Sequence, residues 1–154
     1  MDSLYYQIDK DALYALVDAE VSKVADEAYA EDGTSLYDTV VLTLKDRDTI
    51  DAFFPDGLHA LCRAISDIAS YYEIGAYIGS TPAVKPTMQV YVPDFDRTQE
   101  KAVEAQIDRY LVLYACNALF HQRRTVLVPE YTNRVQWAMD NAITLLRKRI
   151  TPTR

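Results

Sequence analysis

The side chains that most often bind metal ions are few and far apart in this sequence. His59 and His121 are its two histidines, and 62 positions separate them. Neither lies in a Cys-x-x-Cys or His-Glu-x-x-His motif, whose spacing brings two metal ligands together. A metal site would require both histidines to meet a carboxylate across the fold, whereas a solvated histidine requires nothing further. We therefore expect no metal site.

Residues that could act as nucleophiles or as acid–base catalysts also lack partners. Cys62 and Cys116 have no neighbouring base, and no Gly-x-Ser-x-Gly turn occurs. The sequence contains four glycines, which are too few and too scattered for a glycine-rich phosphate loop. The carboxylates of the first predicted helix lie on its polar face, without the burial that tunes the pKa of a catalytic acid or base. We expect no catalytic residue and no cofactor, and we expect both cysteines to be reduced core residues.

Charge is distributed unevenly along this chain of net charge −7. Residues 1–60 carry −10, residues 61–100 carry −2, and residues 101–154 carry +5. An acidic front and a basic end would let copies of the chain attract one another head to tail, although two solvated faces would give the same distribution. The acidic whole and the lack of a recognised binding motif argue against DNA as the main partner.

Contact with other proteins is the chemistry that the remaining residues favour. The chain has twelve tyrosines, which suit protein interfaces as well as the rim of a small core. Residues 73–87 contain two glycines, two prolines and several apolar side chains, which predicts a loop. A loop that long is usually functional or disordered, and its apolar content favours a docking surface. The candidate partner-binding residues are Tyr77 and Ile78 in this loop, and Arg147, Lys148, Arg149 and Arg154 in the basic C-terminal tail.

The element that must organise these groups is a central helix over residues 98–121, which Asp96 can cap. Its apolar residues recur at spacings of three and four, and in residues 110–120 the only polar side chain is that of Asn117. A helix that is apolar on all sides is buried, and this apolar stretch is too short to cross a bilayer. We predict the central helix of a soluble helical domain, covered by other helices on both sides.

The first and last helices should flank this central one. The first is predicted to begin at Asp9, as its cap, and to end near Ala30, with Leu16 in its apolar stripe. The last opens at Pro129, because proline suits the first turn of a helix. Residues 147–154 follow it as a basic tail.

The remaining long helix contains a proline. Asp48 with Asp51 resembles a capping box, and apolar residues keep helical phase over residues 50–72. Pro55 and Gly57 interrupt this run without changing its phase. The pattern therefore predicts a kinked helix, or a short helix that leads into a longer one.

Two short segments have the composition of strands. Residues 39–44 are rich in β-branched side chains, and residues 88–92 lie between two prolines. We predict that they pair as a two-stranded ribbon.

The order of these features resembles a known class of proteins. An acidic first helix precedes Asp-Arg-Asp-Thr-Ile-Asp-Ala-Phe-Phe at 46–54, followed by Gln-Val-Tyr-Val-Pro at 89–93 and Ile-Asp-Arg-Tyr-Leu-Val-Leu-Tyr at 107–114. The arrangement is similar to small helical head–tail connector (neck or adaptor) proteins of tailed phages and prophages of Bacteroides-type gut bacteria. The resemblance implies a subunit that assembles in a ring between the portal and the tail, with no catalytic residues.

These observations together predict one mainly α domain over residues 1–154: about four long helices around residues 98–121, with a small ribbon. The functional hypothesis is a non-enzymatic virion subunit, made in the bacterial host cytoplasm, that contacts copies of itself and neighbouring portal or tail proteins. One alternative is a cytoplasmic helical interaction module or assembly chaperone. A second is a small enzyme with a pocket between helices. No segment reaches about 18 apolar residues, so we expect no membrane span.

Overall fold

The computed structural model describes residues 3–69, 71–78 and 81–148. Over these residues the fold is mainly α, with four long helices and a small antiparallel sheet, as predicted. In chain order the elements are β1 (Ser3–Gln7), α1 (Lys10–Asp26), α2 (Tyr37–Val40), η1 (Leu44–Asp46), α3 (Arg47–Ala64), β2 (Tyr71–Ile78), β3 (Thr81–Tyr91), η2 (Arg97–Gln99), α4 (Glu100–Arg123), η3 (Thr125–Leu127) and α5 (Val128–Leu146). None of the helices in the described residues has the length and apolar content that crossing a membrane requires.

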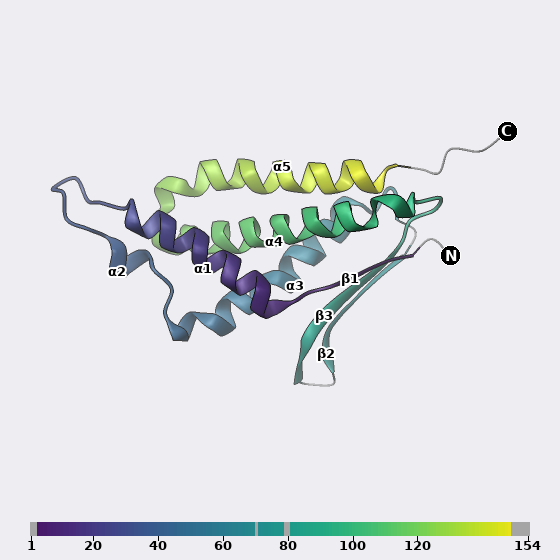
Figure 1. The fold of residues 1–154 in the computed structure, drawn as a ribbon, viewed down its shortest axis with the longest axis horizontal. Helices are drawn as coiled ribbons and strands as arrows, with labels where there is room; N and C mark the ends of the chain where they lie inside the picture. The colour runs from purple at the N-terminus through teal and green to yellow at the C-terminus, as the bar shows by residue number, and fades with distance from the viewer. Residues whose placement is uncertain (1–2, 70, 79–80, 149–154) are drawn as a thin grey trace.

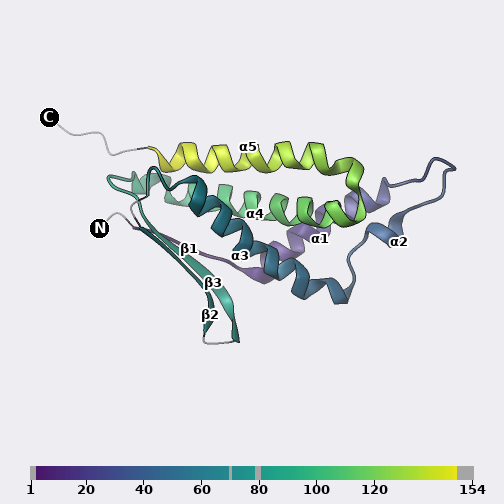
Figure 2. The same cartoon turned by 180° about the vertical axis from the view of Figure 1, so that it is seen from behind.

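Helix α4 is the centre of the structure. Helices α1, α3 and α5 all pack against it, with α5 along one side and α1 and α3 on the other (Figures 1 and 2). No side chain of residues 110–120 is exposed, and Tyr110, Cys116 and Phe120 are completely buried. The prediction of a buried central helix is confirmed.

Helix α1 begins where its capping residue predicts. Asp9 Oδ1 accepts a hydrogen bond from the backbone N–H of Ala12 at 3.1 Å, which satisfies a donor of the first turn. The predicted end near Ala30 is wrong, because the helix stops earlier. Residues 28–36 instead form a turn closed by backbone hydrogen bonds, in which Gly33 adopts a φ of +86° that favours glycine.

Helix α3 continues through Pro55 as one α-helix. Its predicted extension to Tyr72 is wrong, because that residue pairs with β3 in the sheet. The predicted cap formed by Asp48 with Asp51 is also wrong, because the Asp51 carboxylate accepts a hydrogen bond from the Arg47 guanidinium at 3.0 Å. Asp51 thus pairs with Arg47, one helical turn before it, and not with Asp48 as a cap.

Residues 39–44 do not form the predicted strand. Helix α2 and the short helix η1 occupy half of this segment, at its two ends, and side chains form local hydrogen bonds there in place of a strand partner. The Thr39 hydroxyl donates to the carbonyl of Leu36 at 2.7 Å, and Thr43 and Asp46 form a capping box at η1. The predicted ribbon between residues 39–44 and 88–92 is therefore wrong.

The sheet has the strand order β1-β3-β2. Strand β3 contains residues 88–91 of the predicted strand at 88–92, and it pairs with β1 and β2: Val90 lies opposite both Leu4 and Tyr72. Alternate residues of β1 and β3 are buried, including Leu4, Tyr6, Met88 and Val90. One face of the sheet thus completes the core that the helices form.

The prediction of a loop over residues 73–87 is wrong: its described residues lie in strands β2 and β3, and residues 79 and 80 lie outside the described residues. Strands β2 and β3 pair antiparallel along this segment, with a shift of register between Gly75 and Tyr77. Strand β1 pairs with β3 only as far as Thr87, so the far part of the hairpin extends beyond β1 (Figure 1). Glycine and proline gave a loop signal here because neither favours a strand on its own, whereas the pairing of β2 with β3 overrides that local preference.

Candidate protein-interaction surface

Three hollows adjoin one another along α1, and we call them together the α1 groove. The middle hollow, of about 700 Å³, lies between α1 and α4. It shares Leu16 and Asp108 with a hollow of about 360 Å³ near the start of α1, and Glu20, Lys23 and Arg134 with one of about 190 Å³ near the start of α5. The groove therefore runs along most of α1, on the face seen in Figure 1.

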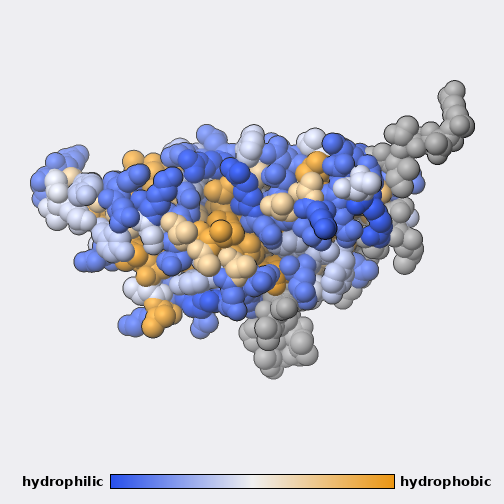
Figure 3. Space-filling model, viewed as in Figure 1, coloured by the Kyte–Doolittle hydropathy of each residue, from blue (hydrophilic) through white to orange (hydrophobic). Residues whose placement is uncertain are grey.

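The middle of the α1 groove is apolar. Its lining includes Leu16 and Ala19 from α1, and Val112 and Leu113 from α4. Leu16 leaves 54% of its surface exposed. Hydrophobic residues gather in the centre of this face, over the crossing of α1 and α4 (Figure 3). An apolar hollow of this kind gains free energy when another molecule removes it from water.

One polar atom in this lining has no partner. The Oε1 atom of Gln106 is buried and accepts no hydrogen bond from any described residue. A buried acceptor without a donor costs about 1–3 kcal/mol relative to a paired one. An occupant that offers an N–H or O–H group would remove this cost.

The end of the groove near the start of α1 is acidic. Asp9, Glu104 and Asp108 line it, and its other lining residues include no lysine or arginine. The Tyr6 hydroxyl donates a hydrogen bond to Asp108 across the boundary between β1 and α4. Burial raises the pKa of the Asp108 carboxyl, and the nearby charge of Asp9 raises it further despite the hydrogen bond from Tyr6. Burial likewise raises the pKa of Tyr6. This end would attract a cationic group.

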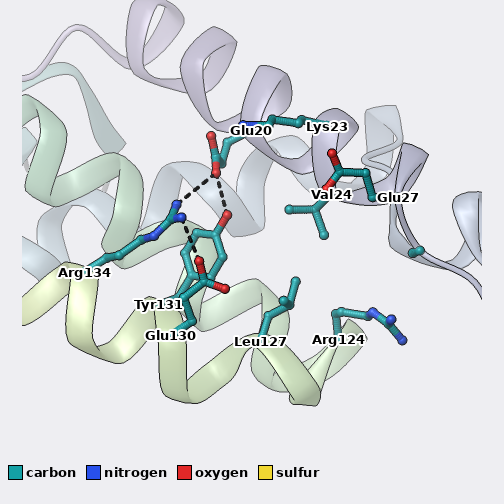
Figure 4. A pocket seen from close by; sticks show the side chains of 10 residues that line it. Glu20, Lys23, Val24, Glu27, Arg124, Leu127, Glu130, Tyr131 and Arg134 are labelled. Atoms are coloured by element: carbon teal, nitrogen blue, oxygen red, sulfur yellow. Dashed lines mark hydrogen bonds and ion pairs between the residues drawn. The ribbon is translucent and has the colours of Figure 1, made fainter.

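The end near the start of α5 holds charges of both signs, joined in a network (Figure 4). The Tyr131 hydroxyl donates a hydrogen bond to Glu20, whose carboxylate also lies 3.5 Å from the Arg134 guanidinium. Arg134 donates to Glu130 at 2.7 Å and lies over the Tyr131 ring. Burial and the Glu20 hydrogen bond raise the pKa of Tyr131. Figure 4 shows Arg124 pointing away from this network.

An exposed tryptophan lies on α5, on the helix that also carries Arg134. Trp137 is 54% exposed, and the guanidinium carbon of Arg109 lies 5.2 Å from the centre of its ring. Because Arg109 also lines the α1 groove, this cation–π pair joins the groove to the exposed face of α5. Exposed tryptophan and arginine are typical of protein-binding surfaces.

Of the predicted partner-binding residues, Tyr77 and Ile78 lie in the sheet rather than on the helices that form the α1 groove. Tyr77 and Ile78 belong to β2, opposite Pro82 and Thr81. Their strand contacts the helices through α3, at a different part of the molecule from the groove. The structure places these two residues on β2, whereas Arg147 and Lys148 directly follow α5.

The described part of the basic tail packs against its own chain. Arg147 pairs with Asp67 at 2.8 Å, and the carbonyl of Lys148 accepts a hydrogen bond from the backbone N–H of Asp96. Arg149 and Arg154 lie outside the described residues. The Arg147 guanidinium, predicted as a contact group for a partner, is therefore already paired within its own chain.

Histidine and cysteine do not meet in a reactive cluster in the described part of the chain. His59 on α3 and His121 on α4 are both exposed, and neither lines the α1 groove. Cys62 and Cys116 are free, buried thiols. Burial raises the pKa of Cys62 to about 11. Among the described residues, no group of three or more His, Cys, Asp or Glu side chains is placed to hold a metal ion.

Sequence reasoning missed the α1 groove because two of its residues had another role in the pattern. Leu16 fits the apolar stripe of the first helix, and Val112 lies on the second apolar side of the central helix. The structure leaves Leu16 half exposed, because α1 crosses α4 and the two helices diverge. The second apolar side of the central helix was the available signal.

Comparison with protein-family models, with curated proteins and with solved structures found no match.

Proposed function

We propose that this chain is a non-enzymatic structural subunit of a tailed-phage virion, a head–tail connector or neck adaptor that acts by assembling with copies of itself and with portal or tail proteins. It would be made in the host cytoplasm and incorporated at the neck of the virion. The resemblance of residues 46–54, 89–93 and 107–114 to connector proteins supports the class. The groove and its surroundings support the mode of action.

The observation that carries the proposal is the open apolar centre of the α1 groove. Leu16 lies half exposed above an apolar lining, so a partner that covers it would remove apolar surface from water. Covering Leu16 would stabilise a complex by about 1 kcal/mol, and the neighbouring apolar surface would add to this. Trp137 and Arg109 beside it are residue types that dominate the binding energy of many interfaces.

A buried central helix suits this role. Because α1, α3 and α5 all pack on α4, the two walls of the groove are held by one core. A pre-formed surface loses little conformational entropy when a partner binds. Such a scaffold can hold the same shape in every subunit of a ring.

The test is the mass of the assembly, measured by light scattering after size-exclusion chromatography, for the chain alone and mixed with a candidate portal protein. We expect a ring, or co-migration with the portal ring. A chain that stays monomeric alone and also fails to join the portal ring would refute the proposal. A small, defined complex with a non-virion protein would instead support an interaction module or chaperone.

Two leucine variants provide a matched comparison. Leu16→Lys places a charge in the α1 groove, whereas Leu44→Lys places one at a leucine that is 96% exposed and lies outside the groove. We expect Leu16→Lys to abolish the assembly and Leu44→Lys to leave it intact. Equal effects of the two substitutions would show that the groove is not the contact surface.

A further inference from the structure

The turn between α4 and α5 has a composition that complements the acidic end of the groove. Residues 121–129, which we call the α4–α5 corner, read His-Gln-Arg-Arg-Thr-Val-Leu-Val-Pro and contain no carboxylate. Val126 leaves 67% of its surface exposed. The corner therefore offers an apolar side chain within a basic segment.

The two arginines of the corner have different roles. Arg123 is held within its own subunit, since its guanidinium donates to Asp46 and, at 3.2 Å, to the carbonyl of Val41. The Arg124 guanidinium takes part in no ion pair with a described residue, and Figure 4 shows it pointing away from the nearest network of charges. Arg124 is thus the cation that the corner can offer to another molecule.

The acidic end of the α1 groove has the opposite character. Its carboxylates, from Asp9, Glu104 and Asp108, lie beside the half-exposed side chains of Leu16 and Tyr5, without a lysine or arginine in the lining. Carboxylates grouped on a partly apolar surface repel one another, and an incoming cation relieves that repulsion. The surface is therefore apolar and acidic where the corner is apolar and basic.

The two surfaces are too far apart to meet within one subunit. Glu104 lies in the second turn of α4 and Arg124 directly follows its end, so about 30 Å of helix separates them. Figure 1 shows the start of α4 and the α4–α5 corner at opposite ends of the helix bundle. Contact between them requires two copies.

We propose that the α4–α5 corner of one copy docks into the acidic end of the α1 groove of the next copy, with Val126 against Leu16 and Arg124 among the carboxylates of Glu104 and Asp108. The contact joins two different surfaces, so it is head to tail and leaves a free surface at each end of a pair. Repeated contacts of this type close into rings when the rotation permits, and otherwise extend as filaments. This inference rests on the proposed function and supplies the contact by which the ring would form.

The test uses the full chain and two variants with opposite defects. Val126→Asp disables the corner, and Leu16→Asp disables the groove; both residues are more than half exposed, so both variants should fold, which circular dichroism checks. Sedimentation velocity of the wild-type chain up to millimolar concentration should show species larger than a dimer. Each variant alone should associate at least about tenfold more weakly.

A mixture of the two variants gives the decisive result. The intact corner of Leu16→Asp can still bind the intact groove of Val126→Asp, while the other two surfaces carry like charges. The mixture should therefore form dimers and stop there. A wild-type chain that stays monomeric at millimolar concentration, association that Val126→Asp does not change, or a mixture that stays monomeric would each overturn the inference.

The charge contact has its own variants. Arg124→Glu and Glu104→Arg should each weaken association, and the double variant, which exchanges the charges, should restore it. A double variant as weak as the single ones would overturn the pairing of these residues. If the head-to-tail contact fails these tests while the chain still joins the portal ring, the proposed function stands without it; if both fail, both are refuted.

Discussion

Replacing Gly57 with alanine tests how closely α3 approaches α4. Gly57 is buried in α3, and its carbonyl accepts a hydrogen bond from the Tyr110 hydroxyl of α4 at 2.9 Å. A Cβ atom added there would lie 2.8 Å from Leu111 Cδ2 and 3.3 Å from the Tyr114 ring. Ordinary contacts begin at 3.4 Å, and Leu111 is completely buried, so its side chain cannot move aside into solvent.

The expected effect is the difference between two opposing contributions. Overpacking a core costs about 1–3 kcal/mol. Alanine in place of glycine in a helix returns about 1 kcal/mol through backbone entropy. We therefore expect Gly57→Ala to lower the free energy of unfolding by about 1 kcal/mol, which corresponds to a fall of about 2–4 °C in Tm. Urea denaturation followed by circular dichroism measures it.

A second substitution separates the clash from other causes. Leu111→Ala alone should cost about 2–5 kcal/mol, because it leaves a cavity. In that background the atom nearest to the new methyl group is gone, so Gly57→Ala should become stabilising by up to about 1 kcal/mol. The sign of the effect should thus depend on residue 111. A substitution that is equally harmful in both backgrounds, or stabilising in both, would refute the close approach as the reason for glycine at this position.

Three further predictions concern ionisable groups. The Arg123 hydrogen bond lowers the pKa of Asp46 below 3.8, so this carboxylate stabilises the fold above that pH, and the stability is lost as pH falls through the folded pKa. Asp46→Asn should therefore reduce the loss of unfolding free energy between neutral and acid pH, measured by denaturation at a series of pH values. An unchanged pH dependence would refute this. The ionised Asp108 carboxylate instead destabilises the fold, because burial raises its pKa above 3.8. Asp108→Asn should therefore increase the free energy of unfolding at pH 7, and this gain should disappear as pH falls through the folded pKa toward 3.8. A lower free energy of unfolding at pH 7 would contradict this prediction. Burial raises the pKa of Cys62 to about 11 and that of Cys116 further, so a maleimide should label both thiols slowly in the folded chain and rapidly in guanidinium; fast labelling of the folded chain would refute their burial.

The parts of the fold that the sequence predicts depend on neighbours in the chain. The central helix shows a repeat of Val103, Ile107 and Leu111. Its second apolar side indicates that the helix is buried, but does not indicate which elements cover it. Asp9 caps α1 and Pro129 opens α5 through interactions within one helical turn. Patterns of this length are visible in a single sequence.

The incorrect predictions concern pairing between distant residues. The run at 39–44 has the composition of a strand, but residues 88–91 already have β1 and β2 as partners, and the threonines of the run form local hydrogen bonds instead. Residues 73–87 have the composition of a loop, but they gain a strand partner by folding back. The α1 groove was missed for a related reason: the angle at which the two helices cross depends on their packing in space, which the apolar pattern of neither helix specifies.

The hairpin that extends beyond β1 has a consequence for how the chain behaves in a crowded cell. A strand with an open edge is a template for further strands, and it is a common origin of aggregation. In the uncovered part of β3, Pro82 and Pro86 have no backbone N–H to donate, and the register shift opposite Gly75 and Tyr77 disturbs the regular ladder. The projecting strand is therefore a poor template, so subunits at high concentration should meet through their helical faces rather than by adding strand to strand.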